Sequence, residues 1–160
     1  MYKGFLTSVE MTMKNYMKTL VIYYSLTGNT RFIAEQIAQK SGADILELKP
    51  ERGQGSKSRP KPLPLTKDLA DYDLIILGTP VWGFNFAPAI RTFLNQAKLE
   101  NKKLALFVCH EDLPAKTLAS LENALAGNQI IGKTLFSEPL KNPTGTKEKA
   151  TKWLESITPT

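Results

Sequence analysis

The sequence predicts an α/β fold in which one open, parallel β-sheet carries helices on both faces. Apolar runs rich in β-branched residues alternate with segments of helical periodicity along most of the chain. Parallel strands need right-handed crossover connections, and the intervening helices can supply them. With 160 residues, 42% of them hydrophobic, the chain is long enough for one domain with a substantial core.

The pattern begins as strand, helix, strand. Residues 20–24 (LVIYY) form a continuous apolar run, as expected of a strand that is covered on both faces. A helix follows, and Gly42 is placed to end it. The apolar positions of this helix share one face: Ile33, Ala34, Ile37 and Ala38. Residues 44–49 form a more polar strand that suits the edge of a sheet.

A proline-rich, basic stretch then interrupts the alternation. Four prolines between residues 50 and 64 remove helical continuity. Residues 49–67 hold six basic side chains and one acid, so they supply most of the net charge of +6. We interpret this stretch as a solvated surface connection.

The second half of the chain continues with three strands and three helices. The strands are expected at residues 74–77, 104–108 and 129–135, the last being the weakest. Pro88 opens the first of these helices, and Gly127 follows the second. Each helix has an apolar stripe at helical spacing: Ile90, Phe93, Leu94 and Ala97; Leu118, Leu121 and Leu125; Ala150, Trp153, Leu154 and Ile157.

Composition excludes several classes of protein. The chain has one cysteine, Cys109, and one histidine, His110, which rules out an intramolecular disulfide and a Cys- or His-cluster metal site. No apolar run approaches the roughly 18–20 residues that cross a bilayer, and residues 1–18 lack a signal-peptide core. We therefore expect a cytoplasmic protein in which residues 1–17 are an N-terminal extension, loosely packed or disordered, and residues 18–160 form a single domain.

The loops after the first, third and fourth strands are the candidate ligand-binding segments, because ligands of open parallel sheets bind beyond the carboxyl ends of the strands. The first loop, residues 25–30 (SLTGNT), joins a strand directly to a helix. Its hydroxyls, the N–H groups of the helix start and its glycine suit a phosphate dianion held by neutral donors. The alternative is a polar turn in which Asn29 or Thr30 caps the helix.

The second loop, residues 78–87, carries three aromatic side chains within five residues. Trp82 could present a flat face to a planar ligand. Gly78 and Gly83 would let backbone groups approach the edge of that ligand. The alternative is that the aromatic side chains pack over the end of the sheet.

The third loop begins at Cys109, which is more simply explained as a small buried residue at a strand end than as a nucleophile. His110 is either a ligand contact or proton donor, or merely an exposed side chain. Glu111 and Asp112 most simply cap a helix that opens near Pro114.

Two of these segments resemble the signatures of the flavodoxin family. Residues 25–30 match its phosphate loop, whose pattern is Thr/Ser-x-Thr-Gly-x-Thr. Residues 71–82 (DYDLIILGTPVW), followed by residues 87–94 (APAIRTFL), are similar to the second signature of flavodoxin-like proteins. The resemblance covers about residues 18–158 and implies a flavodoxin-like three-layer fold with a five-stranded parallel sheet in the order 2-1-3-4-5.

The resemblance also implies that the protein binds FMN. It implies no metal, and it assigns no catalytic residue. The phosphate would lie on residues 25–30, and the isoalloxazine between residues 79–83 and the loop that starts at Cys109, with Trp82 as the flanking aromatic. The candidate cofactor-binding residues are Ser25, Leu26, Thr27, Gly28, Asn29, Thr30, Thr79, Pro80, Val81, Trp82, Gly83, Cys109 and His110.

The implied function is electron transfer through FMN between redox partner proteins. The sequence departs from the family in three ways: the third loop has no aromatic residue, the proline-rich stretch replaces the second helix, and the charge is +6 where electron-carrier flavodoxins are usually strongly acidic. The positive charge favours an acidic partner. The alternative is an NAD(P)H-dependent FMN reductase or quinone reductase, in which the basic stretch would attract a phosphate-bearing nicotinamide.

Two other functions fit the sequence poorly. A receiver-type signalling domain would need an acidic pocket at the end of the first strand, where Tyr24 and Ser25 stand instead. The basic residues of 49–67 lack the interleaved aromatics of a nucleic-acid surface. We expect neither a nucleic acid nor a membrane as partner, and a monomer or weak dimer.

Overall fold

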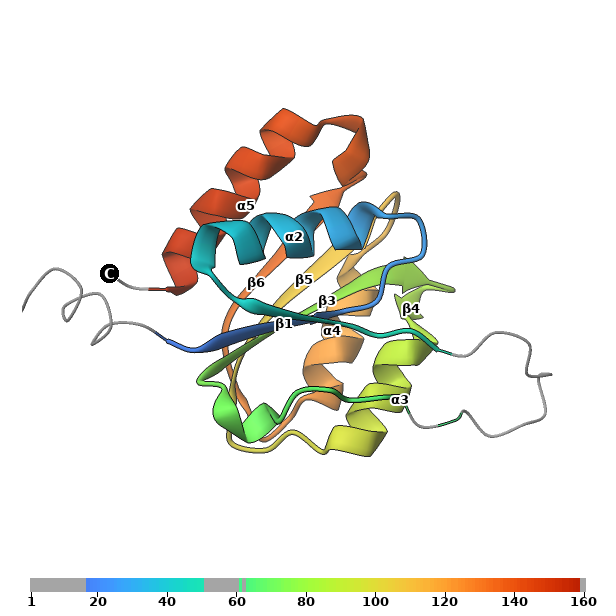
Figure 1. Cartoon of the computed structure of the whole chain (residues 1–160). Coiled ribbons are helices and arrows are strands. Elements are labelled where there is room, and N and C mark those ends of the chain that lie inside the picture. The colour runs from blue at the N-terminus through green and yellow to red at the C-terminus, as the bar shows by residue number, and fades with distance from the viewer. Residues whose placement is uncertain (1–16, 51–60, 62, 159–160) are drawn as a thin grey trace, which may run out of the picture.

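Five parallel strands and one short antiparallel strand form the sheet of this protein (Figure 1). The computed structural model describes residues 17–50, 61 and 63–158, so the predicted N-terminal extension except Met17, and most of the basic stretch, lie outside the described residues. The strands are β1 (Thr19–Tyr23), β2 (Asp44–Glu47), β3 (Leu74–Trp82), β4 (Asn85–Phe86), β5 (Lys103–His110) and β6 (Gln129–Ser137).

The spatial order of the strands is β2-β1-β3-β5-β6, with β4 paired to β3 alone. Counted along the chain without β4, the five parallel strands follow the predicted order 2-1-3-4-5. The three-layer α/β fold class is therefore confirmed. The prediction of five strands missed β4, because a two-residue strand leaves no alternating pattern in the sequence.

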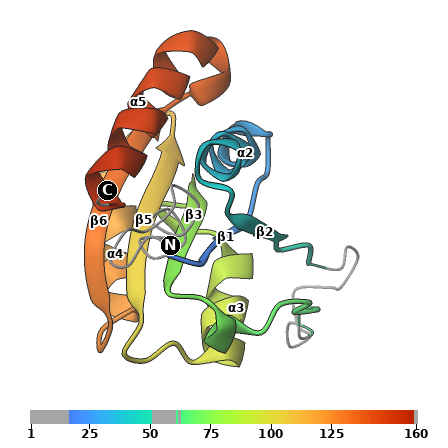
Figure 2. The same ribbon diagram turned by 60° about the vertical axis from the view of Figure 1, so that its left-hand side comes forward.

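The helices cover both faces of the sheet (Figures 1 and 2). One face carries α2 (Asn29–Ser41) and α5 (Pro143–Ile157), and the other carries α3 (Pro88–Ala97) and α4 (Ala115–Ala124). Two short 3-10 helices, η1 (Leu69–Asp71) and η2 (Pro139–Lys141), precede β3 and α5. The predicted stop at Gly42 is confirmed, since this residue ends α2 in the left-handed conformation at φ 72°.

Side chains of the central strands alternate between two apolar cores. Ile75 and Leu77 belong to the core beneath α3 and α4, whereas Leu74 and Ile76 belong to the core beneath α2 and α5. All four are fully buried. This two-sided burial explains why these strands are continuously apolar in the sequence.

The segment predicted as the second loop is in fact largely strand. β3 continues to Trp82, because residues 78–80 still pair with residues 107–109 of β5. The chain then turns back, and β4 pairs with Val81 and Trp82. Cys109 and His110 were likewise expected in a loop, but they end β5 opposite Phe136 and Ser137 of β6. Strand pairing therefore extends further toward the ligand-facing edge than the sequence indicated.

Gly78 has a packing role that differs from the predicted one. A Cβ atom placed on this residue would lie 2.1 Å from Cζ of Phe107 on the neighbouring strand. The Phe107 ring fills that space and is itself enclosed by Phe136 and Trp153, at ring-centroid distances of 6.2 and 6.3 Å. Gly78 therefore leaves room for an aromatic ring from the neighbouring strand.

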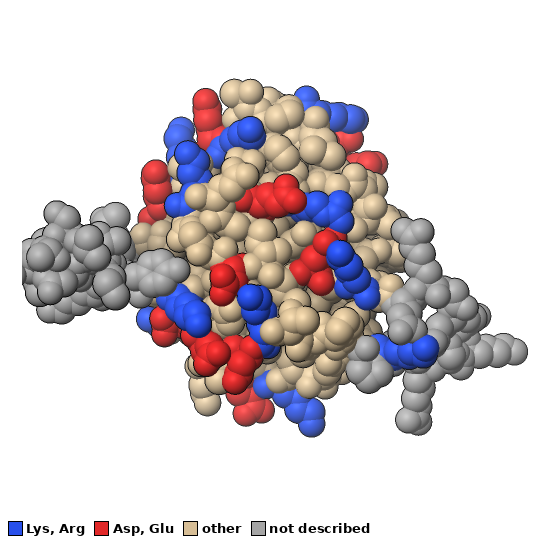
Figure 3. Space-filling model, in the orientation of Figure 1, with Lys and Arg blue, Asp and Glu red and all other residues tan. Residues whose placement is uncertain are grey.

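Positive and negative side chains are intermixed on the face shown in Figure 3. Half of the net charge of +6 falls in residues 1–16 and 51–60, which lie outside the described residues. Within the described ranges, no helix combines the length and the apolar character needed to span a lipid bilayer.

Candidate functional site

The carboxyl ends of β1, β3 and β5 border a cleft with a volume of about 390 Å³. This volume lies in the range of roughly 300–1,000 Å³ that small-molecule sites occupy. The lining residues come from the three segments that the sequence singled out: Leu26, Thr27 and Asn29; Pro80, Val81, Gly83 and Phe84; Cys109, His110, Glu111, Asp112 and Leu113. Eight of the thirteen predicted cofactor residues are in this lining.

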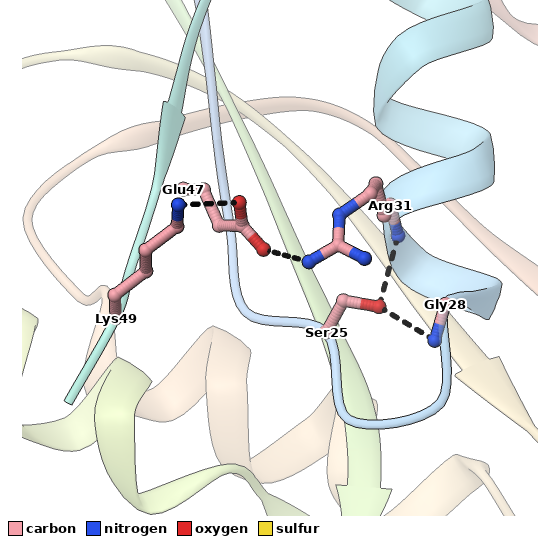
Figure 4. Close-up of polar contacts among 5 residues, drawn as sticks. All are labelled: Ser25, Gly28, Arg31, Glu47 and Lys49. Carbon is pink, nitrogen blue, oxygen red and sulfur yellow. Dashed lines mark hydrogen bonds and ion pairs between the residues drawn. The ribbon is translucent and has the colours of Figure 1, made fainter. Parts of the chain in front are cut away.

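The loop of residues 25–30, called the phosphate loop below, is held by the side chain of Ser25. Its Oγ accepts hydrogen bonds from the backbone N–H groups of Gly28 at 3.1 Å and Arg31 at 3.2 Å (Figure 4). Gly28 adopts φ +97°, a left-handed conformation that favours glycine. Ser25 thus closes the turn from within and lies outside the cleft lining, as does Gly28.

Several hydrogen-bond donors of the phosphate loop stay unused. Among the described residues, nothing accepts a hydrogen bond from the backbone N–H of Thr27, Asn29 or Thr30. The Thr30 hydroxyl is buried beside the Cys109 thiol, and no hydrogen bond of ordinary geometry satisfies it among the described residues. Unpaired donors at a helix N-terminus form an anion site, because the helix dipole adds positive potential at the same place.

The alternative explanation, that Asn29 or Thr30 caps the helix, is wrong. The N-cap is Gly28, and no side chain of the cap residue bonds to the helix. The Asn29 side chain instead donates to Thr27 Oγ1 at 3.1 Å and accepts from the backbone N–H of Leu140 at 2.9 Å. Asn29 therefore ties the phosphate loop to η2, a contact 111 positions away in the chain that no sequence pattern indicated.

The β3–β4 hairpin forms the second wall. Pro80, Val81 and Gly83 line the cleft as predicted, but Thr79 does not. The Thr79 hydroxyl accepts a hydrogen bond from the backbone N–H of Ala87 at 3.0 Å and donates one to the carbonyl of Pro80 at 2.8 Å. Thr79 thus stabilises the hairpin from its buried side.

Two of the three aromatic residues of the hairpin lie differently from what the sequence indicated. Trp82 is outside the cleft lining, and its ring packs against Tyr24 at a centroid distance of 5.9 Å. Phe84 lines the cleft and is 66% exposed, with φ 65° at the turn. Sequence reasoning noticed Phe84 but did not choose it, because only the hairpin determines which aromatic side chain faces the cleft.

An apolar rim surrounds the cleft. Leu26, Phe84 and Leu113 line it and are each at least 60% exposed. Large apolar side chains that contribute to a cleft and stay this exposed mark a surface for a ligand or a partner. Leu113 was missed by the sequence analysis, although an isolated leucine in the polar segment after Cys109 is a signal that could have found it.

The third wall contains Cys109 and His110. Burial raises the pKa of the Cys109 thiol to about 12, so this thiol stays protonated at neutral pH. Cys109 is therefore a buried residue at the end of the strand and not a nucleophile. His110 lines the cleft, and its Nδ1 atom is buried without a hydrogen-bond partner in the described part of the chain. Glu111 and Asp112, which the sequence most simply explained as helix caps, also line the cleft.

The neighbours of His110 favour its neutral form. Burial lowers the pKa of His110 below its ordinary value, and the Lys149 ammonium on α5 lowers it further. Asp112 and Glu138 act in the opposite direction but do not compensate. At neutral pH the imidazole therefore carries one free nitrogen lone pair and one N–H group, which suits contact with a polar ligand edge.

The stability of the folded protein should consequently fall as the pH drops below about 6.5. Because the folded-state pKa of His110 is lowered, the unfolded chain binds more protons, so acid favours unfolding through this residue. Urea unfolding midpoints measured between about pH 8 and pH 5 should decline more steeply for the wild type than for His110→Gln. Equal slopes for the two proteins would contradict this assignment.

One family model and three solved structures show what the chain is similar to. A family model described as "Flavodoxin domain" matches residues 20–129, more than half of the chain. A crystal structure of a flavoprotein in complex with FMN from Lactobacillus acidophilus NCFM is 25% identical, with a TM-score of 0.66; the match covers 86% of this chain and 98% of that one. The solution structure of two-electron reduced Megasphaera elsdenii flavodoxin is 21% identical, with a TM-score of 0.62, covering 88% of this chain and 98% of that one. A flavodoxin, WrbA-like protein from Agrobacterium tumefaciens is 20% identical, with a TM-score of 0.64, covering 89% and 95%.

Proposed function

This chain belongs to the flavodoxin domain family, and from that premise we propose that it binds FMN in the cleft and transfers electrons through it between protein partners. The observation that carries the proposal is the unpaired set of donors in the phosphate loop, placed beside a cleft with an exposed apolar rim. The Lactobacillus acidophilus flavoprotein, which is in complex with FMN, adds support.

The phosphate loop fits the terminal phosphate of FMN. The backbone N–H groups of Thr27, Asn29 and Thr30 would donate to phosphate oxygens, together with the Thr27 and Thr30 hydroxyls. A phosphate also supplies the acceptor that the buried Thr30 hydroxyl lacks. An unsatisfied buried polar group costs about 1–3 kcal/mol, so binding would recover that free energy.

The remaining walls fit a planar ring system. Pro80, Val81 and Phe84 would contact one side of the isoalloxazine, and Leu113 would cover part of another. His110 would offer its unpaired Nδ1 to a polar edge of the ring. Phe84, rather than Trp82, is the aromatic residue of the hairpin that lines this space. Trp82 packs against Tyr24 outside the lining.

FMN would supply one- and two-electron transfer, and the protein would adjust its energetics. Glu111 and Asp112 line the cleft and would disfavour a negative charge on the reduced cofactor, which would lower its reduction potential. The exposed rim of Leu26, Phe84 and Leu113 would then give a redox partner an apolar surface close to the cofactor.

Reconstitution followed by rapid mixing tests this function. The purified protein, loaded with FMN, should lose its flavin absorption band when NADPH and a reductase protein are added together, and only slowly with NADPH alone. Rapid bleaching by NADPH alone would contradict the carrier function and favour an NAD(P)H-dependent reductase. Failure to retain FMN after gel filtration would contradict both.

A further inference from the structure

Arg31 follows the phosphate loop, but its charge is directed away from the cleft. We propose that Glu47 is a positioning residue, which holds the Arg31 guanidinium outside the phosphate site so that phosphate is bound by neutral donors. This inference rests on the proposed function, because it concerns recognition of the FMN phosphate. Glu47 lies on β2, a strand that contributes no residue to the cleft lining.

The backbone of Arg31 is hydrogen-bonded to the phosphate loop. Its N–H donates to Ser25 Oγ at 3.2 Å, beside the N–H of Gly28 at 3.1 Å (Figure 4). Arg31 is the third residue of α2, and side chains in the first turn of a helix lean toward its N-terminus. A guanidinium leaving the chain at this position is therefore in a suitable place to reach an anion bound at the helix start.

The side chain of Arg31 instead turns toward β2. Its Nη2 atom forms an ion pair with Glu47 Oε1 (Figure 4). The pKa of Arg31 is raised, first because of the hydrogen bond to Glu47. The Lys49 ammonium lies 3.6 Å from the other oxygen of the same carboxylate, so Glu47 holds two cations.

Glu47 itself is firmly placed. It pairs with Tyr23 in the parallel β1–β2 ladder, and the backbone N–H of Leu48 continues the ladder with a 2.8 Å hydrogen bond to the Tyr23 carbonyl. The Glu47 side chain is only 19% exposed, compared with 45% for Arg31. The carboxylate is therefore the fixed member of the pair, and the guanidinium is the one that adapts.

The two hollows at this edge of the sheet differ in charge as a result. The guanidinium lines a second hollow, also of about 390 Å³, which shares Leu26 with the cleft and is otherwise lined by Tyr24, Ser25, Arg31, Glu47, Leu48, Lys49 and Pro50. No Lys or Arg among the described residues lines the cleft, which contains Glu111 and Asp112. Glu47 thus keeps the Arg31 guanidinium outside the cleft.

Replacing Glu47 by glutamine tests this role. Without the carboxylate, the guanidinium loses its strongest partner and becomes available to a phosphate at the helix start. We expect Glu47→Gln to bind FMN about 10-fold more tightly, as for one added charge-assisted hydrogen bond, and riboflavin as the wild type does. Fluorescence titration with each flavin measures both affinities. The wild-type FMN affinity should depend weakly on salt, and that of Glu47→Gln strongly.

A double-mutant cycle separates positioning from simple charge repulsion. The gain from Glu47→Gln should vanish in the Arg31→Gln background, because no guanidinium is then left to release. Glu35→Gln, which removes an acid from α2 that does not bond to Arg31, is the matched control and should leave FMN affinity unchanged. Glu47→Asp keeps the charge on a shorter side chain and should show a smaller gain in FMN affinity. This variant tests the role of Glu47 even if Glu47→Gln fails to fold.

The inference is overturned if Glu47→Gln leaves FMN affinity unchanged or weakens it, or if the gain persists in the Arg31→Gln background. A gain that is equal for FMN and riboflavin overturns it too. If the wild type shows no preference for FMN over riboflavin, the phosphate assignment in the proposed function fails, and the inference fails with it.

Discussion

Replacing both Thr27 and Thr30 by valine is expected to weaken FMN binding by about 100-fold or more, since each hydrogen bond to a charged group contributes roughly 1.5–3 kcal/mol. Riboflavin, which lacks the phosphate, should bind as it does to the wild type. Valine keeps the shape of threonine and removes only the hydroxyl, so the contrast between the two flavins isolates the phosphate contacts. Fluorescence titration with FMN and riboflavin measures it.

Thr117→Val is the matched control for this variant. Thr117 lies on α4, is fully buried and, like Thr30, has a hydroxyl without a hydrogen-bond partner in the described structure. Neither residue is part of the cleft lining, but Thr30 belongs to the phosphate loop and Thr117 does not. Both substitutions remove an unsatisfied polar group and should not destabilise the apo protein, but only Thr30→Val should weaken FMN binding. Equal losses for FMN and riboflavin in the Thr27/Thr30 variant would show that the phosphate does not lie on this loop.

Gly78→Ala is expected to destabilise the protein by about 3 kcal/mol or more, at the upper end of the cost of overpacking a core. The added methyl group would lie 2.1 Å from Phe107 Cζ and 2.5 Å from Phe107 Cε2, far inside van der Waals contact. Phe107 is fully buried and cannot move aside without displacing Phe136 and Trp153. For a chain of this size, such a loss lowers the thermal midpoint by roughly 6–12 °C, measurable by calorimetry or circular dichroism.

A smaller side chain at position 107 should rescue this variant. Phe107→Leu alone leaves space over Gly78 and should destabilise the protein. In the double variant the new methyl group occupies part of that space, so the two losses should not add. Additive losses would mean that the Phe107 ring is not what makes glycine necessary at position 78.

The phosphate loop shows how far local sequence reaches. Residues 25–30 were selected because a hydroxyl-rich turn leads from a strand into a helix, and the structure places that turn at the edge of the cleft with unpaired N–H groups. The individual roles could not be predicted in the same way. Whether Ser25 faces a ligand or closes the turn depends on its χ1 rotamer and on the position of Arg31, and neither leaves a trace in composition.

At the hairpin, local sequence and the structure point to different residues. Three aromatics in five residues indicated a ligand-facing segment, but Trp82 was chosen and Phe84 lines the cleft. Side chains alternate between the two faces of a strand, so the choice depends on where β3 ends. β3 continues to Trp82 because β5 and β4 supply partners for its backbone, and both partners are distant or weakly patterned segments.

The sequence by itself determined the order of strands and helices, the three-layer fold and the three segments that approach the cleft, because these depend on periodicity and on short signals read along the chain. Only the tertiary structure decided that Asn29 joins the phosphate loop to η2, that Gly78 accommodates Phe107 and that Glu47 holds Arg31. Each of these contacts joins groups that are 16 or more positions apart in the sequence. Such pairs meet only when the packing of helices on a twisted sheet brings them together, and no local pattern encodes that distance.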